Sequence, residues 1–334
     1  MFSLSRIVHN SPYPVDVSVL TPVYNVEKYL PQCLDSLKAQ TLKRIEFIVI
    51  NDGSTDGSLD ILQAYAAEDP RVVIVNQPNG GYGKAMNAGL AIARGEYIGI
   101  VESDDFADPH MFETLYRYAA RRDCDIVKSN YYTYDGQDHF EEPFVGHPYR
   151  KPFDVRERLD VVKVLPIIWA AIYRRSMLQD NGILFNETPG ASFQDTSFVQ
   201  RAWFASHRVA LLRKGYLHYR VNRDESSVKS DKKVFEVCGE YELSNEFLHA
   251  DPERLESFGR VFQVMRLDTY RWNYNRIASA YHEQFAERWA REVREAQDEG
   301  LLDRDYFSER DWALIHELMD DPAAFAAKYE ELEL

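Results

Sequence analysis

The sequence contains little cysteine and no long apolar run. Its three cysteines, Cys33, Cys124 and Cys238, are odd in number and widely spaced, which argues against a disulfide framework or a metal spacing and favours reduced thiols. No stretch approaches the roughly 18 apolar residues of a membrane span, and residues 1–14 lack the apolar core of a signal peptide. We therefore expect a cytoplasmic protein; peripheral attachment at the inner face of a membrane stays open.

The chain also lacks an excess of positive charge. Its 39 Lys and Arg against 54 Asp and Glu give a formal net charge of −15, whereas a general nucleic-acid binder needs a basic face to replace counterions. No nucleic-acid partner is therefore expected. The 334 residues, of which 45% are hydrophobic and 28% charged, are sufficient for a sizeable core and one or two domains.

The first 130 residues alternate between short apolar runs, which predict strands, and segments with helical spacing. The expected strands are 15–20, 45–50, 72–75, 97–101 and 126–130, and the expected helices are 27–39, 59–67, 84–93 and 111–120. This alternation predicts an α/β protein with a Rossmann-like, mostly parallel sheet flanked by helices, because parallel strands need helical crossovers.

The pattern changes beyond residue 130. An irregular insertion, an apolar segment, a turn-rich loop, a helix and one or two strands are expected in turn at 133–160, 161–178, 181–191, 195–205 and 209–221. Pro166 prevents a single helix in the apolar segment. From about residue 232 the chain is mostly helical. We therefore expect an α/β domain over 1–230, followed by a helical C-terminal region over 231–334.

Three acidic residues follow the expected fourth strand. The apolar run at 97–101 ends in Glu102, Ser103, Asp104 and Asp105. Crowded carboxylates repel one another unless a cation lies among them, and Mg²⁺ is typically held by one or two carboxylates plus substrate phosphate oxygens. The cluster suggests a metal–diphosphate site at a strand end, where open α/β sheets place their ligands. A solvated turn before the next helix is the alternative.

Four loops rich in polar residues or glycine follow the first four expected strands. They are residues 20–25, 51–54, 79–87 and 102–105. Because the carboxyl ends of parallel strands share one edge of a sheet, we expect these loops to converge on a nucleotide site. There Asp52 could accept a hydrogen bond from a base N–H or simply form an Asx turn. The glycines at 80–83 permit close backbone approach to a ligand, and Lys84 offers a charge for phosphate; a flexible turn before a helix is the alternative.

Taken together, these loops make residues 15–130 resemble the inverting glycosyltransferases of family 2. The stretches that carry the resemblance are Val-Ser-Val-Leu-Thr-Pro-Val-Tyr-Asn at 17–25, Ile-Val-Ile-Asn-Asp-Gly-Ser-Thr-Asp at 48–56, residues 80–87 and Glu-Ser-Asp-Asp at 102–105. The resemblance implies the GT-A fold, with nucleotide-sugar binding over 15–130 and the acceptor side over 131–230. It implies transfer of a sugar from a nucleotide diphosphate sugar, by family preference a UDP-sugar, to a hydroxyl of a glycan or lipid-linked saccharide acceptor.

The resemblance also places roles on individual residues. Those expected to contact the nucleotide-sugar are Pro22, Tyr24, Asp52, Gly81, Lys84, Asn87, Glu102 and Ser103. Glu102, Ser103 and Asp104 occupy the Asp-x-Asp signature of the family, with Asp104 the expected direct ligand of Mn²⁺ or Mg²⁺. The first acid is Glu102 rather than Asp, which shifts its carboxylate by a methylene and leaves its role open.

The resemblance further implies a general base. An inverting transfer needs a carboxylate that takes the proton from the acceptor hydroxyl. Family members carry that acid at the start of a helix, and Asp195 stands at the matching place here. A helix N-terminus favours a charged carboxylate, so Asp195 is the expected catalytic residue; a plain helix cap is the alternative.

A last cluster contains His218, Arg220, Ser226 and Ser227. Related enzymes often place a His or Arg here against the diphosphate or the metal. We therefore expect His218 as a metal ligand, with a structural histidine as the alternative. Arg220 is expected to neutralise the leaving diphosphate, a task that suits a bidentate donor.

Two other classes of protein stay open. A nucleotidyltransferase shares a similar sheet but usually has a Gly-rich loop with Thr-Arg after the first strand, and residues 21–25 contain no glycine. A non-catalytic glycan- or nucleotide-binding protein on the same scaffold is disfavoured by the intact Asp104 and Asp195. Arginines and aromatics interleave over 260–277; core packing is expected there, and contact with anionic lipid or with a second copy in a homo-oligomer stays open.

Overall fold

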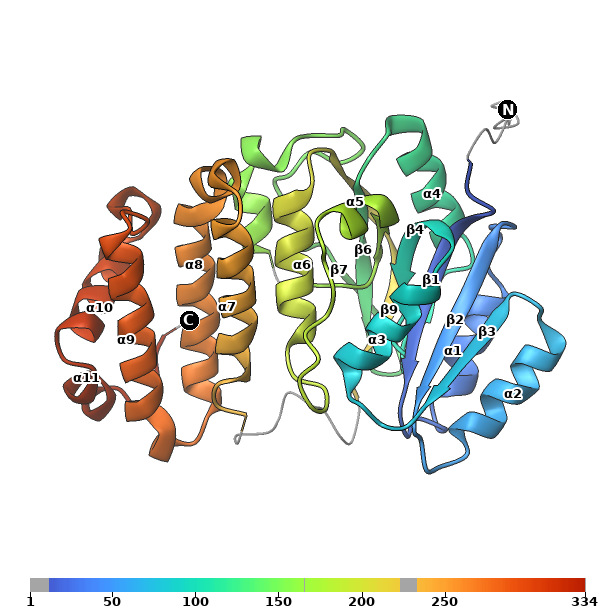
Figure 1. The fold of residues 1–334 in the computed structure, drawn as a ribbon, viewed down its shortest axis with the longest axis horizontal. Helices are drawn as coiled ribbons and strands as arrows, with labels where there is room; N and C mark the ends of the chain where they lie inside the picture. Colours follow the sequence, from blue (N-terminus) through green and yellow to red (C-terminus); the bar gives the residue numbers. More distant parts are fainter. Residues whose placement is uncertain (1–11, 165, 223–232, 334) are drawn as a thin grey trace.

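The computed structural model describes residues 12–164, 166–222 and 233–333, and it places a layered α/β region beside a bundle of C-terminal helices (Figure 1). The α/β region consists of β1 (Val15–Val23), α1 (Leu30–Lys38), β2 (Ile45–Asp52), α2 (Ser58–Glu68), β3 (Val72–Gln77), α3 (Tyr82–Ile92), β4 (Gly95–Ile100), β5 (Phe106–Ala107), α4 (Met111–Arg122), β6 (Ile126–Tyr134), β7 (Asp138–Glu141), the 3₁₀ turns η1 (Val155–Glu157) and η2 (Leu159–Lys163), β8 (Ala171–Arg174), α5 (Arg175–Asp180), α6 (Gln194–Ala205) and β9 (Val209–Arg220). The bundle consists of α7 (Glu236–His249), α8 (Pro252–Arg276), η4 (Ser279–Tyr281), α9 (His282–Asp298), η5 (Arg304–Tyr306), α10 (Glu309–Asp320) and α11 (Pro322–Lys328).

The strands form one nine-stranded sheet in the order β3-β2-β1-β4-β8-β6-β9-β5, with β7 paired to β6. The neighbours of β1, which are β2 and β4, and the pair β2–β3 are all parallel. All residues of β1 and β2 are buried, because helices cover both faces of this part of the sheet. The predicted mostly parallel sheet and the helical C-terminal region are confirmed.

The predicted irregular insertion over 133–160 is partly wrong. β6 runs on to Tyr134 and pairs with β7 in an antiparallel hairpin, in which Tyr132 lies opposite Phe140. The turn depends on Asp135, whose Oδ1 accepts from the Gln137 N–H at 3.0 Å, and on Gly136 with φ +119°. The insertion therefore extends the sheet.

The apolar segment at 161–178 forms no single helix, as Pro166 predicts. It contains the end of η2, the short strand β8 and the start of α5. β8 pairs antiparallel with both β4 and β6, so it separates the parallel strands β1–β4 from the parallel pair β6–β9.

The C-terminal helices share the hydrophobic core of the sheet region. α6 lies between the two parts: it contacts α7 and α8, and all its residues except Asp195 are buried. Phe204 of α6 contacts Phe258 and Phe262 of α8, with ring centroids 5.0 and 6.1 Å away. Within the described ranges, no helix has the length and apolar character needed to cross a membrane.

Candidate active site

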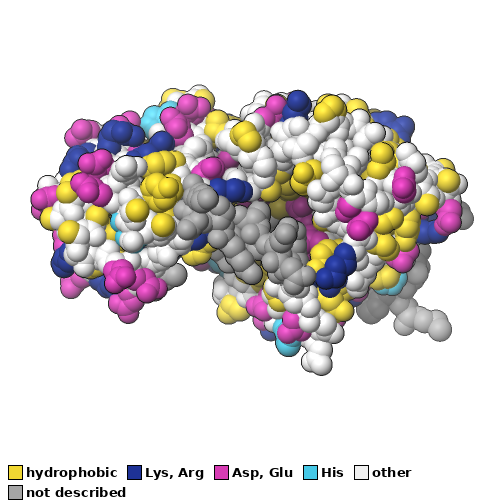
Figure 2. All heavy atoms as spheres, turned by 90° about the horizontal axis from the view of Figure 1, so that it is seen from below, with side chains coloured by type: hydrophobic (Ala, Val, Ile, Leu, Met, Phe, Trp, Pro, Cys, Tyr) yellow, Lys and Arg dark blue, Asp and Glu magenta, His cyan; other side chains and the backbone are white. Residues whose placement is uncertain are grey.

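The parallel strands β1 to β4 end at one edge of the sheet, the lower edge in Figure 1. We call this the carboxyl edge. Seen from this side, the surface is hollowed near its centre, and acidic side chains are visible in the hollow (Figure 2). The four predicted loops therefore meet in space. At the first of them, Pro22 is buried within β1, and Tyr24 just beyond it is 51% exposed.

Asp52 holds the loop at residues 79–83, which we call the glycine loop. Its carboxylate is buried and accepts hydrogen bonds from Gln77 Nε2 at 2.7 Å and from the backbone N–H groups of Gly80 and Gly81, each at 2.9 Å. A carboxylate has about four acceptor positions, so about one remains for a ligand. Gly81 has φ +89°, and a Cβ there would lie 2.8 Å from the Gly190 nitrogen. Only glycine fits this position, and the loop is pressed against residues 188–190.

Hydrogen bonds and close packing join α3 to the loop that precedes α6. The Asn87 side-chain amide accepts from the Phe185 N–H at 2.8 Å and donates to the Phe185 carbonyl at 2.9 Å. A Cβ on Gly83 would lie 1.8 Å from the Asn186 carbonyl oxygen. Asn87 thus holds the 185–187 segment in place, and its expected contact with the donor stays a prediction. Lys84 is exposed beside the glycine loop.

The loop at residues 102–105 after β4, which we call the acidic loop, is largely buried. Ser103 and Asp104 are 6% and 5% exposed. Glu102 Oε1 accepts from the Tyr82 hydroxyl at 2.7 Å, which joins the acidic loop to α3. The Asp105 carboxylate accepts a hydrogen bond from the backbone N–H of Arg220 at 2.9 Å, which joins the loop to β9.

Arg220 braces the acidic loop. Its guanidinium donates to the Asp104 carbonyl at 2.9 Å and to Gln32 Oε1 of α1 at 2.6 Å. The group also lies over the rings of Tyr29 and Tyr134, 4.9 and 5.0 Å from their centroids. These contacts give Arg220 a positioning role in the protein. Its contact with a leaving diphosphate stays a prediction.

His218 is held by protein groups. Its Nδ1 lies 2.6 Å from Asp138 Oδ1, and its ring stacks between those of Phe106 and Tyr132, at centroid distances of 4.4 and 5.0 Å. This environment is that of a structural histidine, the alternative that the sequence left open, and a metal-ligand role stays a prediction. Ser226 and Ser227 lie outside the described residues.

Asp195 lies in the first turn of α6, and the N-cap position belongs to Phe193, whose φ is +63°. Burial raises the pKa of Asp195 to about 6, although the backbone N–H groups of Asp195 and Thr196 act in the opposite direction. Burial together with the charges of Glu102 and Asp195 raises the pKa of the Tyr82 hydroxyl well above its usual value. Asp195, Tyr82 and Glu102 are therefore neighbours in the structure.

Sequence reasoning missed several residues of this region. Gln194 holds the 188–192 loop, since it donates to Thr188 Oγ1 at 2.8 Å and accepts from the Ser192 N–H at 2.5 Å. Tyr82 stood inside the glycine loop and could have been found there. Glu240 belongs to α7 and had no local signal, because its role depends on packing against a distant segment.

Glu240 links the helical region to the site. Its carboxylate accepts from the Ser197 hydroxyl of α6 and from Asn186 Nδ2 at 2.8 Å. Burial raises the pKa of Glu240 to about 7, and the charge of Asp195 contributes in the same direction. A residue of the C-terminal region thus contacts both α6, which carries Asp195, and the loop that meets α3.

The metal expected at this edge can be tested against the residues present. Among the residues that the structure describes, no group of three or more His, Cys, Asp or Glu is placed to hold a metal ion. The described residues therefore form no closed cage of protein ligands. Asp104 supplies hard oxygen donors, which fit Mg²⁺ or Mn²⁺ when a substrate diphosphate completes the coordination.

Three comparisons place the chain among known proteins. A family model described as glycosyl transferase family 2 matches residues 18–182. The chain is 34% identical over 212 residues to an uncharacterized glycosyltransferase, EpsJ, of Bacillus subtilis (strain 168), covering 62% of this chain and 61% of EpsJ. It is 32% identical over 260 residues to the putative glycosyltransferase EpsH of the same organism, covering 76% of this chain and 73% of EpsH.

A solved structure shares the fold. The crystal structure of Staphylococcus aureus TarS 1–349 in complex with UDP-GlcNAc aligns with a TM-score of 0.62 and 20% identity, covering 94% of this chain and 91% of that one. At this identity the likeness concerns the fold alone.

Proposed function

This chain belongs to glycosyl transferase family 2, and from this we propose that it transfers a sugar from a nucleotide diphosphate sugar to a hydroxyl of a glycan or lipid-linked saccharide. We propose UDP as the nucleotide and inversion at the anomeric carbon. The structural likeness to a TarS structure that holds UDP-GlcNAc supports the choice of donor class. The family membership of the chain supports the reaction class.

The observation that carries this proposal is the proximity of Asp195 to Tyr82, whose hydroxyl donates to Glu102 Oε1 at 2.7 Å. This proximity supports Asp195 as a base beside the carboxyl edge, where the glycine loop held by Asp52 and the acidic loop lie. Asp195 is also the one residue of α6 that is only partly buried, so an acceptor hydroxyl can approach it. A base with a pKa of about 6 is ionised at neutral pH and close to the value that is best for proton transfer.

In the proposed reaction the acceptor oxygen forms a bond to the anomeric carbon while the bond from that carbon to the diphosphate oxygen breaks. The hydroxyl proton moves to the Asp195 carboxylate, and the bonding electrons leave with the diphosphate. Attack on the face opposite the leaving group inverts the configuration.

The donor side is formed by the glycine and acidic loops. We assign the nucleobase to Pro22, Tyr24 and Asp52, and the diphosphate to the neighbourhood of Gly81 and Lys84. Asp52 has about one acceptor position left for a base N–H. Asp104 is the residue that would hold a divalent cation. When bound, such an ion neutralises charge on the diphosphate.

A panel of nucleotide-sugars tests the proposal. Purified protein is incubated with UDP- and GDP-sugars, Mn²⁺ and saccharide acceptors, and released nucleotide is measured. We expect release from one donor or a few, and a product whose anomeric configuration by NMR is opposite to that of the donor. Formation of a nucleoside triphosphate and a sugar 1-phosphate when pyrophosphate is added would instead indicate a nucleotidyltransferase, and binding without turnover a non-catalytic protein. Retained configuration would overturn the inverting mechanism.

The proposed metal dependence has its own test in the same assay. Excess EDTA, or the substitution Asp104→Asn, should remove most turnover and divalent-dependent donor binding while thermal unfolding stays near that of the wild type. The matched control is Asp60→Asn, because Asp60 is exposed on α2 and the same charge is removed. Full activity in EDTA would contradict metal dependence.

A further inference from the structure

A groove lined by arginines runs along α4. Its volume is about 360 Å³, and its lining residues are Glu113, Thr114, Arg117, Tyr118, Arg121, Arg122 and Arg150. Four of these seven residues are arginines, in a chain whose net charge is −15. Such a local concentration of one charge in an oppositely charged protein needs an explanation.

Most of these guanidinium groups are not neutralised by the protein. Glu113 is the one acid in the lining, and it pairs with Arg117 at 2.7 Å. Arg121, Arg122 and Arg150 are exposed and form no ion pair with an acid of the described ranges. The groove therefore carries uncompensated positive charge.

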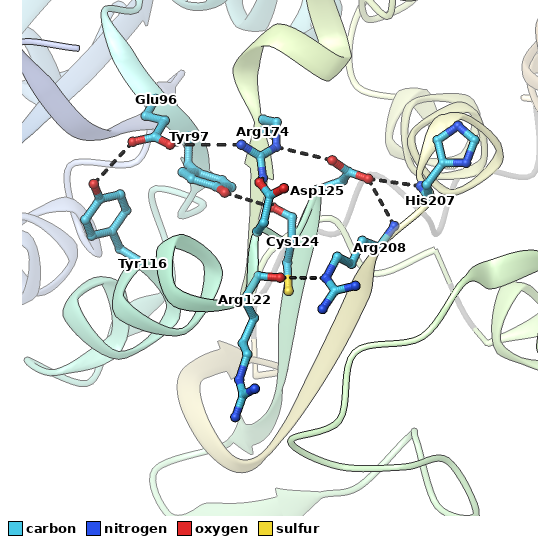
Figure 3. A network of polar contacts seen from close by, with 10 residues as sticks. Glu96, Tyr97, Tyr116, Arg122, Cys124, Asp125, Arg174, His207 and Arg208 are labelled. Atoms are coloured by element: carbon cyan, nitrogen blue, oxygen red, sulfur yellow. Dashed lines mark hydrogen bonds and ion pairs between the residues drawn. The ribbon is translucent and has the colours of Figure 1, made fainter. Parts of the chain in front are cut away.

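Arg208, the residue directly before β9, lies beside the end of α4. Arg208 Nε donates to the Arg122 carbonyl at 2.6 Å, and Figure 3 shows the two residues beside each other. The Arg208 backbone N–H is held by Asp125 Oδ2 at 3.0 Å. The position of Arg208 is thus fixed by the network in Figure 3, while its guanidinium is directed toward the end of α4.

Arg150 reaches the groove from a strained backbone. Its φ is +59°, a region that non-glycine residues seldom adopt. The strain persists because the Arg150 N–H donates to the Leu211 carbonyl at 2.8 Å, next to the bridge between Tyr149 and Leu211. Backbone strain of this kind is concentrated at functional sites.

A hydroxyl donor lies among the arginines. The Tyr118 oxygen is buried and has no hydrogen-bond partner in the described part of the chain. Burial raises the pKa of Tyr118, against the opposing charges of Arg122, Arg150 and Arg208. The hydroxyl therefore keeps its proton at neutral pH and is a neutral hydrogen-bond donor. A buried polar atom without a partner is costly unless a ligand or water satisfies it.

The helix dipole does not account for the whole cluster. Arg121 and Arg122 lie in the last turn of α4, where cations are favoured. Arg150 and Arg208 come from other segments and owe nothing to that effect. The cluster also lies near the starts of β6 and β9, which pair at Ile126 and Val209. The starts of these strands lie at the opposite edge of the sheet from the carboxyl edge. The groove is therefore separate from the candidate active site.

We propose that the groove binds a phosphate ester. Guanidinium groups are planar forks that bind phosphate oxygens in pairs, and Tyr118 adds a neutral donor. A volume of about 360 Å³ is near the lower end of small-molecule sites, which suits a phosphorylated monosaccharide or the headgroup of an acidic phospholipid. Both sources present the same phosphate chemistry to the arginines.

Calorimetry with inorganic pyrophosphate tests the site. The full chain is titrated in EDTA, so that metal-assisted binding at the carboxyl edge does not contribute. We expect the variant Arg121→Gln/Arg150→Gln to bind at least tenfold more weakly than the wild type, and Tyr118→Phe to bind a few-fold more weakly. The matched control is Arg291→Gln/Arg310→Gln, because both arginines are exposed on other helices and the net charge changes equally.

Sedimentation with vesicles separates the two sources. Co-sedimentation of the wild type with phosphatidylglycerol vesicles, lost in Arg121→Gln/Arg150→Gln but not in the control, identifies a lipid headgroup. Pyrophosphate binding without co-sedimentation identifies a soluble phosphate ester. Absence of both activities in the wild type, or equal weakening in the two double variants, overturns the proposal. Melting temperatures close to that of the wild type establish that the variants fold.

Discussion

The balance between hydrogen bonding and desolvation determines what a carboxylate can do at the carboxyl edge. Asp195 and Asp52 are both acids at this edge, but their surroundings differ. Asp52 accepts three hydrogen bonds from the protein, whereas desolvation dominates at Asp195 and raises its pKa to about 6. The first arrangement suits an anchor and a donor contact, and the second suits a base.

The substitution Asp195→Asn tests the base. Asn keeps the shape and hydrogen-bonding oxygen of Asp but cannot take a proton. We expect turnover to fall by roughly 10²–10⁴, the usual worth of general-base catalysis, with donor affinity little changed because the base acts on the acceptor. Transfer kinetics with donor titration measure both quantities. Near-normal turnover would refute the assignment.

The pH dependence of turnover and of stability provides a second test of Asp195. The carboxylate must be ionised to act, so the turnover of the wild type should fall as pH drops through about 6. The raised pKa also means that folding stabilises the protonated form, so the charged form costs stability above the unfolded pKa. Asp195→Asn should therefore raise the melting temperature at pH 8 but have little effect near pH 3.

The substitution Asp52→Ala tests the anchor and the nucleobase contact together. It removes the acceptor for Gly80 and Gly81, and the proposed acceptor for a base N–H. We expect UDP affinity to weaken by about 1–3 kcal/mol, the range for hydrogen bonds to a charged group, as measured by calorimetry. The exposed Asp60→Ala is the control. Unchanged UDP affinity in Asp52→Ala would leave Asp52 without a part in donor binding.

At the scale of elements, α6 connects the sheet to the helical bundle. Its start carries both Asp195 and Ser197, and the Ser197 hydroxyl donates to Glu240 of α7. Glu240 also accepts from Asn186, whose neighbours Phe185 and Glu187 are held by Asn87 of α3. The placement of Asp195, the proposed base, therefore depends on three helices.

The substitution Glu240→Ala tests this connection. It leaves the buried hydroxyl of Ser197 and the part-buried amide of Asn186 without this acceptor, and a buried unsatisfied group costs about 1–3 kcal/mol. We expect a melting temperature several degrees lower and a turnover about tenfold lower, since a small misplacement of catalytic groups is costly. Glu242→Ala on the same helix is the control, because Glu242 is 62% exposed. Equal effects of the two variants would contradict the role of Glu240.

At the scale of the whole molecule, the division into 1–230 and 231–334 remains a proposal. The hydrophobic core runs through both parts without a break. Nearly all of α6 is buried, and its Phe204 packs on α8. The bundle therefore covers apolar surface that the sheet region would otherwise expose.

A truncation tests whether the first part can fold alone. A chain that ends at residue 232 should aggregate or lose cooperative unfolding, because removal of α7 and α8 exposes the apolar side chains of α6. Size-exclusion chromatography and thermal circular dichroism measure this. A monomeric fragment with a sharp transition and wild-type UDP affinity would instead establish two independent domains.

The sequence by itself determined the α/β class, the predicted strands and helices to within a few residues, and the convergence of four loops on one edge. These follow from local patterns: β-branched runs, helical spacing, and the rule that parallel strands end together. The acidic loop and the glycine loop were found for the same reason, since each is a contiguous motif.

The tertiary structure alone decided the position of β8 between β4 and β6, the bracing role of Arg220 and the link through Glu240. It also decided that Asn87 holds the 185–187 segment and that the pKa of Asp195 lies near 6. Each of these depends on contacts between segments far apart in the chain. Burial and hydrogen-bond partners arise only when those segments pack, so no local pattern could encode them.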